Sequence, residues 1–305
     1  MSRSLKAHLL LLAATLVWGA TFIVIKAALA DASPLVFNAV RMVLAAVLLL
    51  VIFRHRLRSM TVGVWRAGFT IGTLMWLGYE FQTDGLLYTS ASKSAFLTGV
   101  SVVLVPILLA LFWRGHVNRY TLGGVMAACV GLYLLCIPAG QGLSLASLNR
   151  GDILTLGCAV AFAFQIIAVG RSAQHYDFAH LVTIEIAVCA AWMLISIPFE
   201  RHAYLRLTPR LLVALAITSI VGTVGCFIVQ AWAQRFTPPT HTALIFSLEP
   251  VFAGLTSYAV LGERLGARAI VGAALILAGV LASEVLGQVQ VPEAEISDEL
   301  GEEAI

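Results

Sequence analysis

Long apolar stretches separated by short polar turns repeat along the whole chain. Ten of these stretches have the length of a membrane-spanning helix: 8–30, 34–53, 64–84, 92–113, 119–138, 151–171, 179–199, 209–235, 239–261 and 266–287. A helix needs about 20 apolar residues to cross the hydrocarbon core of a bilayer. The pattern therefore predicts an all-α integral membrane protein with ten transmembrane helices and no soluble domain.

The ten stretches divide into two similar sets of five. We place the first copy at 7–138 and the second at 151–287; a Thr-rich turn in each leads into a later helix, and the matching Thr89 and Thr237 are 148 positions apart. Since five is an odd number of spans, the copies must lie in opposite orientations. Inverted repeats of this kind build the alternating-access sites of secondary transporters at the bilayer midplane.

The composition agrees with a membrane protein. Hydrophobic residues make up 60% of the 305 residues and charged residues 11%, against about 25% charged in a soluble domain. The segment 288–305 differs, because it holds six acidic residues and no basic one. Such a composition cannot bury enough apolar surface to fold, so we expect a solvated, disordered tail, with partner binding as the alternative.

Basic residues are unevenly divided between the two sides. With ten spans, ten arginines and lysines fall on the side of the N-terminus and eight on the other; within the first copy the division is eight to two. The second copy alone has the opposite bias. Because the first helices usually dominate, the positive-inside rule places both termini in the cytoplasm. We expect the inner membrane of a bacterium.

Nothing in the sequence indicates a metal site, a cofactor or an enzyme. The five cysteines lie inside apolar spans and form no CxxC pair, so we interpret them as small packing residues. The chain contains no HExxH, GxSxG or Walker A run. We expect membrane lipid and a small-molecule substrate as partners, and no nucleic acid.

Small residues at four-residue spacing mark two helices that pack closely. They are Gly123, Ala127 and Gly131 in the fifth span and Ala274, Ala278 and Ala282 in the tenth. Lipid is as apolar as leucine, so membrane helices associate through small residues that let the backbones approach. The stripes predict either packing within the chain or a homodimer.

Two charges lie at matching positions inside the membrane. Arg41 is about eight residues into the second span, and Glu185, 144 positions later, is its equivalent in the seventh. A charge at the bilayer centre costs roughly 2.5–3.5 kcal/mol, so it normally faces a partner or a cavity. We expect an ion pair between the repeats, a gate that breaks and reforms, or a direct contact with substrate.

The third span ends in a polar segment. Tyr79, Glu80, Gln82 and Asp84 lie within one and a half turns, which is too polar for a lipid-facing surface. Glu80 and Asp84 are one turn apart and share a face. They predict the mouth of a cavity, with proton carriage as the alternative.

Prolines interrupt matching helices of the two copies. Pro250 follows Glu249 in the ninth span, and Pro106 lies in the fourth. Proline has no N–H and frees a carbonyl one turn back, and broken helices in matching positions are a pointer to the substrate site. Glu249 is therefore a candidate for coupling or amine recognition, or else a carboxylate satisfied by nearby hydroxyls.

Aromatic and amide side chains on the same spans could line an amphipathic pocket. The candidates for the substrate cavity are Trp18, Asn38, Tyr79, Gln82, Phe96, Gln165, Trp232 and Phe246. The candidates for coupling or gating are Arg41, Glu80, Glu185 and Glu249. Each aromatic residue alone is as well explained by core packing.

As a set, these motifs resemble the EamA family of ten-helix permeases in the drug/metabolite transporter superfamily. The matching pieces of the first copy are 18–22, Lys26, Arg41, 82–86, 89–93, 95–97 and Pro106; those of the second are 151–152, 248–251, 261–264, Gly272 and Gly279. Phe162 stands where the family often has Trp. The resemblance covers nearly the whole chain, and it implies a cavity lined chiefly by the third, fourth, eighth and ninth spans.

The resemblance also implies export of amino acids or related metabolites by alternating access. The runner-up is a proton-driven effluxer of drugs or organic cations, in which Glu249 or Glu80 would bind the cation. A membrane scaffold or sensor without flux is a third hypothesis, against which the kinks and intramembrane charges argue. Since the chain has no ATP site, uphill transport would need an ion or exchange gradient.

Overall fold

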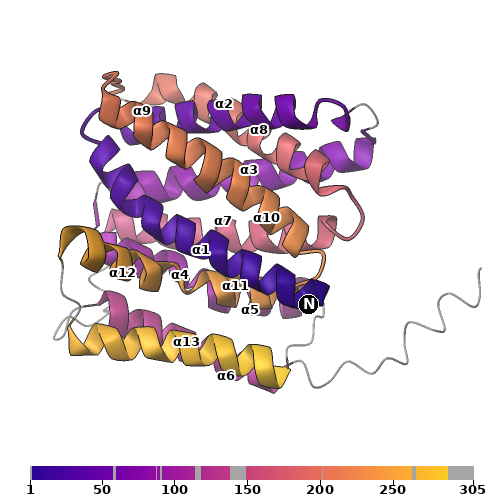
Figure 1. Cartoon of the computed structure of the whole chain (residues 1–305), viewed down its shortest axis with the longest axis vertical. Helices are drawn as coiled ribbons and strands as arrows, with labels where there is room; N and C mark the ends of the chain where they lie inside the picture. Colours follow the sequence, from indigo (N-terminus) through magenta and orange to yellow (C-terminus); the bar gives the residue numbers. More distant parts are fainter. Residues whose placement is uncertain are drawn as a thin grey trace, which may run out of the picture.

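The computed structural model describes residues 2–57, 60–86, 88–89, 91–113, 118–137, 149–200, 202–262 and 266–287. Within this part the chain is almost entirely helical (Figure 1), and its β-structure is one isolated bridge between Ala32 and Leu205. The predicted tail at 288–305 and residues 263–264 of the family pattern lie outside the described residues.

The first half of the chain contains α1 (Arg3–Ala28), α2 (Pro34–Phe53), α3 (Val62–Leu86), α4 (Ala91–Gly99), α5 (Ser101–Trp113) and α6 (Arg119–Cys136). The second half contains α7 (Arg150–Ser172), α8 (Phe178–Ser196), the 3-10 turn η3 (Ile197–Phe199), α9 (Pro209–Ala216), the π-helix η4 (Ile217–Gly225), α10 (Cys226–Ala233), α11 (Pro239–Phe246), α12 (Glu249–Leu261) and α13 (Ala267–Gly287). These helices coincide with the ten predicted stretches.

The membrane character is confirmed, whereas the count of ten spans stays a prediction. In the described part of the chain, eight helical segments are long and apolar enough to cross a bilayer. α13 contributes a shorter apolar run, Ala267–Ser283, and α3 is not among the eight. The polar residues near the end of α3 are consistent with its lower apolar content.

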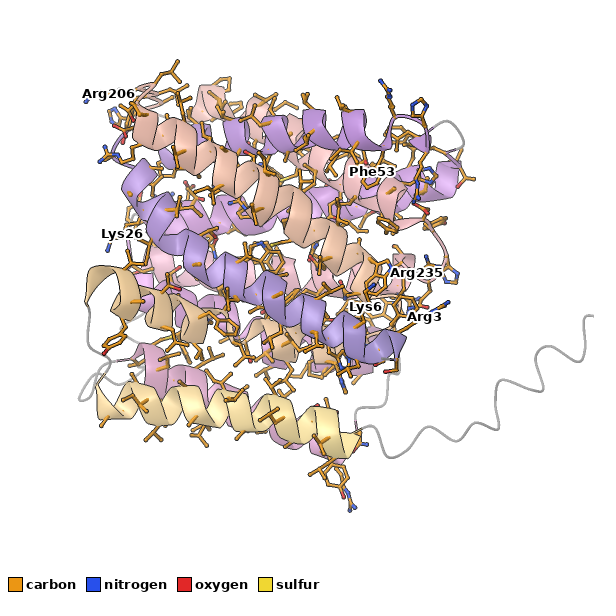
Figure 2. The ribbon with its side chains drawn as sticks, viewed as in Figure 1. Arg3, Lys6, Lys26, Phe53, Arg206 and Arg235 are labelled. Atoms are coloured by element: carbon orange, nitrogen blue, oxygen red, sulfur yellow. The ribbon has the colours of Figure 1, made fainter. Side chains whose placement is uncertain are left out.

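The two halves run in opposite directions through the bundle. Figure 2 shows Arg3, Lys6, Phe53 and Arg235 at one end, here called the N-terminal face, and Lys26 and Arg206 at the other, the distal face. α1 begins at the N-terminal face, whereas α7 ends there: Gln174, just after α7, donates a hydrogen bond of 3.2 Å to the carbonyl of Arg235.

The main helix–helix contacts between the two halves each have a counterpart in which every helix is replaced by the equivalent helix of the other half. α2 packs on α8, and α6 packs on α13. α3 packs on α7 as α10 packs on α1, and α5 packs on α7 as α12 packs on α1. The first half of the chain therefore packs against the second along most of the bundle, as an inverted repeat requires.

A capped helix start ties the halves together at the distal face. Asn149 accepts from the backbone N–H of Asp152, and Asp152 accepts from that of Asn149, which is a capping box for α7. The hydroxyl of Thr89 donates to Asp152 Oδ1 at 2.7 Å, and the amide of Asn149 donates to the carbonyl of Tyr88 at 2.9 Å. The predicted Thr-rich turn therefore anchors α7 to the end of α3.

Glycines hold α6 directly on the backbone of α13. A Cβ added to Gly124 would lie 2.5 Å from the carbonyl oxygen of Gly279, and one added to Gly131 would lie 2.6 Å from that of Gly272. The predicted stripes are corrected on both helices. A Cβ at Gly123 would have nothing within 4 Å, and Ala274 and Ala278 of α13 are exposed, whereas Gly272 and Gly279 make the close contact. Gly124 and Gly131 are two turns apart on one face, and Gly123 is rotated away from it. The close packing lies within one chain.

Candidate functional site

Two helices are interrupted at matching positions. The fourth predicted span breaks at Val100, between α4 and α5, and the ninth breaks at Ser247 and Leu248, between α11 and α12. Val100 and Leu248 are 148 positions apart, the offset seen in the repeat. Irregular backbone at membrane depth occurs where protein or water can satisfy its polar groups.

The interruptions are not caused by the prolines in the way the sequence predicted. α5 continues through Pro106, six residues after the break. Pro250 lies in the first turn of α12, where a missing N–H costs nothing. At the second break the Ser247 hydroxyl donates to the Leu244 carbonyl at 2.6 Å, which helps to satisfy the freed backbone.

The π-helix η4 supplies unusual polar contacts in the eighth span. A π-turn leaves carbonyls out of the regular ladder and often marks a functional site. The carbonyl of Gly222 accepts a hydrogen bond of 2.7 Å from Trp18 Nε1 on α1. The hydroxyl of Thr223 donates to the Thr218 carbonyl at 2.9 Å and accepts from Arg41 at 2.7 Å.

Arg41 lies deep in the bundle and is held by neutral groups. Its side chain is on α2 and the residue is 3% exposed. Besides the bond to Thr223, its guanidinium carbon lies 5.6 Å from the centre of the Tyr79 ring on α3, a cation–π distance. No ion pair of Arg41 is present among the described residues.

The predicted ion pair between Arg41 and Glu185 is therefore not formed. Glu185, 1% exposed on α8, instead accepts a hydrogen bond of 2.8 Å from Gln165 Nε2 on α7. The offset correctly related the two residues by the repeat. It did not show that polar neighbours on η4 and α7 satisfy each residue separately.

Glu249 shares the environment of Arg41. It begins α12 directly after the helix break, and its backbone carbonyl lies against Gly19 of α1, next to Trp18, which bonds to η4 beside the Thr223 partner of Arg41. Within the part of the chain that the structure describes, the Glu249 carboxylate makes no hydrogen bond or ion pair. The predicted alternative, satisfaction by neighbouring hydroxyls, is not seen. Two opposite charges thus face one region without touching.

Aromatic rings from both halves surround this polar centre. Trp18 meets Phe246 at 5.0 Å between centroids and Phe227 at 5.4 Å. Tyr79 meets Phe162 edge-on at 5.6 Å. Phe227 was not among the predicted residues, and only its place in the polar-rich eighth span could have suggested it.

Two predicted cavity residues lie elsewhere. Phe96 is 6% exposed and packs edge-on against Tyr133 of α6, at 6.1 Å. Trp232 lies near the N-terminal face, where Lys6 Nζ is 5.4 Å from its ring centre. Both are core or interface residues, the alternative recognised from the sequence.

A chain of glutamines extends from Glu185 into α10. Gln230 Nε2 donates to Gln165 Oε1 at 3.2 Å and to Gln234 Oε1 at 3.1 Å, and Gln234 Nε2 donates to the Ile166 carbonyl at 2.9 Å. The Gln230 Oε1 atom is buried without a partner. The sequence analysis missed Gln230 and Gln234, although amides in an apolar span were a usable signal.

The polar side chains at the end of α3 form hydrogen bonds with two different helices, α4 and α2. Gln82 Nε2 donates to the Thr98 hydroxyl of α4 at 3.4 Å, and Asn38 Nδ2 of α2 donates to the Thr83 hydroxyl at 3.2 Å. Glu80 Oε2 is buried without a hydrogen-bond partner. Asp84, one turn beyond Glu80 on α3, is exposed. These residues extend the polar region toward the distal face.

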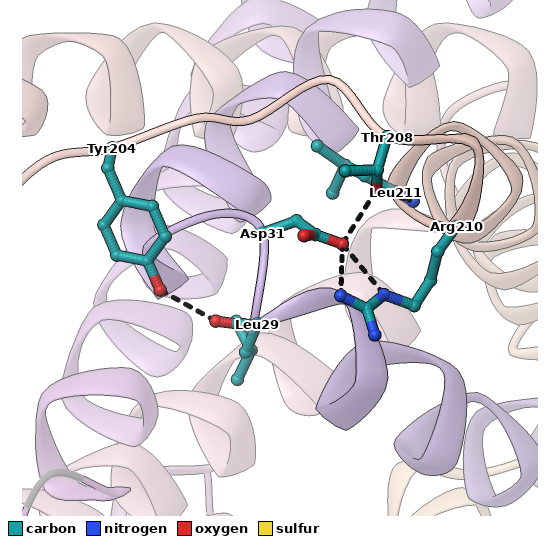
Figure 3. Close-up of polar contacts among 6 residues, drawn as sticks. All are labelled: Leu29, Asp31, Tyr204, Thr208, Arg210 and Leu211. Atoms are coloured by element: carbon teal, nitrogen blue, oxygen red, sulfur yellow. Dashed lines mark hydrogen bonds and ion pairs between the residues drawn. The ribbon is translucent and has the colours of Figure 1, made fainter.

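The distal face is closed by contacts between the two halves (Figure 3). Asp31, in the turn after α1, accepts hydrogen bonds of 2.8 Å from Thr208 and from Arg210 at the start of α9. The Thr208 hydroxyl and the Arg210 guanidinium hold the pKa of Asp31 below its ordinary value. Tyr204 Oη donates to the Leu29 carbonyl at 2.8 Å in the same contact.

At the N-terminal face, the acid in the corresponding turn makes a looser contact, with an arginine in the loop after α2. Asp177, 146 positions after Asp31, lies 3.9 Å from Arg56. The Asp177 side chain is 41% exposed, whereas that of Asp31 is 8% exposed. One face of the bundle is therefore latched more tightly than the other.

No group of residues suited to a metal ion is found in the described ranges. The five cysteines are free thiols, and four of them are buried. The centre offers charged groups, hydrogen-bonding groups and aromatic rings.

Comparison with known proteins gives consistent matches over nearly the whole chain. The sequence matches the EamA-like transporter family over residues 5–137 and 149–283. An uncharacterized transporter of Archaeoglobus fulgidus is 34% identical over 284 residues, which cover 92% of this chain and 86% of the relative. The uncharacterized transporter YoaV of Bacillus subtilis is 23% identical over 279 residues, covering 90% and 95%.

The fold is also found among solved crystal structures, one of which is described only as a crystal structure of a protein. That structure superposes with a TM-score of 0.78 at 17% sequence identity and covers 92% of this chain and 97% of the other. The arrangement of helices described above is thus found in a protein whose sequence has diverged widely.

Proposed function

The chain belongs to the EamA-like transporter family, and we propose that it exports amino acids or closely related zwitterionic metabolites by alternating access. Its substrate binds at the polar centre between α2, α3, η4 and α12.

The pair of unbridged charges, Arg41 and Glu249, carries this proposal. Arg41 is held in place by Thr223 and Tyr79, both neutral, so its positive charge is not cancelled by a carboxylate. Glu249 has no polar partner among the described residues. An amino acid presents one carboxylate and one ammonium group. Its carboxylate pairs with the Arg41 guanidinium, and its ammonium group pairs with Glu249.

Aromatic rings complete the recognition of a small organic solute. Trp18 of α1 and Phe246 of α11 meet at 5.0 Å, and α1 also packs on the backbone of α12 through Gly19. A ring surface offers an apolar side chain a large contact area and offers an ammonium group a cation–π contact. This favours amino acids with apolar or aromatic side chains.

The contacts at the two faces serve as gates. In alternating access, one face opens while the other closes as one repeat rocks against the other. Asp31 with Arg210 closes the distal face, and Asp177 with Arg56 is the looser pair at the N-terminal face. The tight distal pair and the loose opposite pair fit a state poised to open toward the N-terminal face.

Counterflow in proteoliposomes tests the proposal directly. We expect saturable uptake of a radiolabelled amino acid, and weak uptake of the same compound lacking either its carboxylate or its amino group. A charged hydrogen bond contributes about 1.5–3 kcal/mol, so Glu249→Gln should lower amino-acid flux about tenfold or more. An Arg119→Gln variant, which changes a cation outside the centre, is the control.

Two results would reject this substrate class. Wild-type flux in Glu249→Gln would remove Glu249 from recognition. Equal transport of the amine and the amino acid would show that Arg41 does not take part in recognition. The melting temperature of each variant must match that of the wild type, so that loss of folding is not mistaken for loss of binding.

A proton-coupled effluxer of organic cations is the second candidate. The Glu80 Oε2 atom, buried and without a hydrogen-bond partner in the part of the chain that the structure describes, favours it, because such an oxygen is suited to take up a proton or a cation. Proton-dependent flux of organic cations, with amino acids silent, would make this the better function.

The orientation is tested separately. In our proposal both termini are cytoplasmic and the membrane is the bacterial inner membrane, as the positive-inside rule predicts. A reporter fused after Ile305 should then be active only if it functions in the cytoplasm. Activity of a periplasmic reporter at that position would overturn the orientation.

A further inference from the structure

A groove between the two halves opens near the N-terminal face, away from the polar centre. It has a volume of about 360 Å³, within the roughly 300–1,000 Å³ range of ligand pockets. Its walls come from three helices: α3 contributes Arg66 and Leu74, α5 contributes Trp113, and α7 contributes Phe164, Ala168 and Arg171. We call it the Arg66–Arg171 groove.

The groove is graded from cationic to apolar along its length. On α3 the lining runs from Arg66 to Leu74, and on α7 it runs from Arg171 back to Phe164. At 1.5 Å per residue, these distances are about 12 and 10 Å along the helices. Arg66 is one turn into α3 and Arg171 is near the end of α7. Both arginines therefore lie at the membrane interface, and the apolar end lies in the hydrocarbon.

The two arginines have no acidic partner among the described residues. Arg171 lies over the Trp113 ring at 5.1 Å, and no ion pair of Arg66 is present. Asp177, an acid at the same face, pairs with Arg56 instead. Two like charges lining one groove repel each other, and an anion between them removes that cost.

We propose that the Arg66–Arg171 groove binds an anionic phospholipid of the leaflet facing the N-terminus. The lipid phosphate lies between the two guanidinium groups, and one acyl chain runs along Ala168 toward Phe164. Basic pockets between transmembrane helices are suited to anionic headgroups. Trp113 is at the depth where the amphipathic indole ring favours the interface. The lipid would bridge the first half of the chain, through Arg66, to the second half, through Arg171.

The test is lipid binding by native mass spectrometry of the full-length, delipidated protein. Phosphatidylglycerol and phosphatidylcholine with the same acyl chains are compared. We expect tighter binding of phosphatidylglycerol, and a loss of about fivefold for each of Arg66→Gln and Arg171→Gln. Arg119→Gln, a cation at the same face but outside the groove, should bind as the wild type does. This measurement does not depend on which solute is transported.

Several results would overturn the proposal, and each points to a different explanation. Equal affinity for both lipids, or unchanged affinity in the double variant Arg66→Gln/Arg171→Gln, would show that the groove is not an anion site. If glycerophosphoglycerol, the headgroup without chains, or inorganic phosphate bound as tightly, the occupant would be a free phosphate. If neutralising the six tail carboxylates between Glu293 and Glu303 raised lipid affinity as much as the arginine variants lower it, the tail would be the occupant.

Discussion

The Arg41 side chain is an uncommon group for a membrane interior, and its neighbours explain how it is tolerated. A buried arginine in a membrane helix costs several kcal/mol unless polar groups surround it. The Thr223 hydroxyl accepts its Nε–H at 2.7 Å, and the Tyr79 ring faces the guanidinium at 5.6 Å. Because these partners are neutral, they stabilise the side chain without cancelling its charge. The charge remains available to a substrate carboxylate.

Double-mutant cycles separate the observed partner of Arg41 from the one the repeat suggested. Arg41→Gln combined with Thr223→Val should show a coupling energy of about 0.5–3 kcal/mol, because the residues are in contact. Arg41→Gln combined with Glu185→Gln should be additive within about 0.5 kcal/mol, as for residues without a shared partner. The free energy of unfolding in detergent is the measurement. Strong coupling to Glu185 would mean that the ion pair forms in a state other than this one.

At the scale of helices, the helices that pack most closely are not the ones that are interrupted. α6 and α13 are uninterrupted and pack backbone to backbone through Gly124, Gly131, Gly272 and Gly279. The broken spans, α4–α5 and α11–α12, and the π-helix η4 carry the polar contacts instead. A rigid pair at the edge of the bundle and irregular helices near its centre suit a molecule whose interior must rearrange. This division links packing to the proposed transport cycle.

Adjacent glycines on α6 give a matched test of the packing. Gly124→Ala should destabilise the protein by about 1–3 kcal/mol, because its Cβ would overlap the backbone of α13. Gly123→Ala should leave stability unchanged or raise it, since alanine favours helix by about 1 kcal/mol over glycine. The melting temperatures of the two variants in one detergent decide the matter. Equal effects would show that α6 and α13 are not held together at Gly124.

At the scale of the whole molecule, the two faces differ in how firmly they are closed. The backbone N–H of Arg206 donates to the Asp31 carbonyl at 2.7 Å, and that of Ser33 donates to the Tyr204 carbonyl at 3.0 Å. Together with the Asp31–Arg210 pair, which Figure 3 shows, these bonds form a strap across the distal face. The strap joins loops from both halves, so relative motion of the halves must break it.

Amide hydrogen exchange measures how readily the strap opens. Asp31→Asn should speed exchange of the Ser33 and Arg206 amides, because the variant removes the ion pair that holds the two loops together. Asp177→Asn, which changes the related acid at the N-terminal face, should leave those two amides unchanged. Faster exchange in both variants would indicate general destabilisation rather than a gate.

The pH dependence of the strap follows from the lowered pKa of Asp31. A carboxyl whose pKa is lower in the folded state stabilises that state above its ordinary pKa, here 3.8. That stabilisation is lost only as the pH falls through the lowered value. Between pH 5 and 8 Asp31 stays ionised, so exchange at Ser33 and Arg206, corrected for intrinsic rates, should not change with pH. A transition within this range would assign the strap to another group.

Apolar periodicity determined the class of the molecule and most of its helices. A bilayer admits only segments that satisfy their own backbone groups, so length and composition locate the helices directly. The prolines identified the two interrupted spans, but not the position of the first break, which lies at Val100 rather than at Pro106. These are local properties, which each segment carries without its neighbours.

The partners of the polar side chains were decided only by the tertiary structure. The sequence paired Arg41 with Glu185, whereas the fold places Thr223 beside the one and Gln165 beside the other. It assigned the stripe on α6 to Gly123, while the rotation of the helix presents Gly124 to α13. A hydrogen bond or a close contact depends on the relative position of two helices. Packing across the whole bundle sets that position, so the pattern along a single helix cannot specify it.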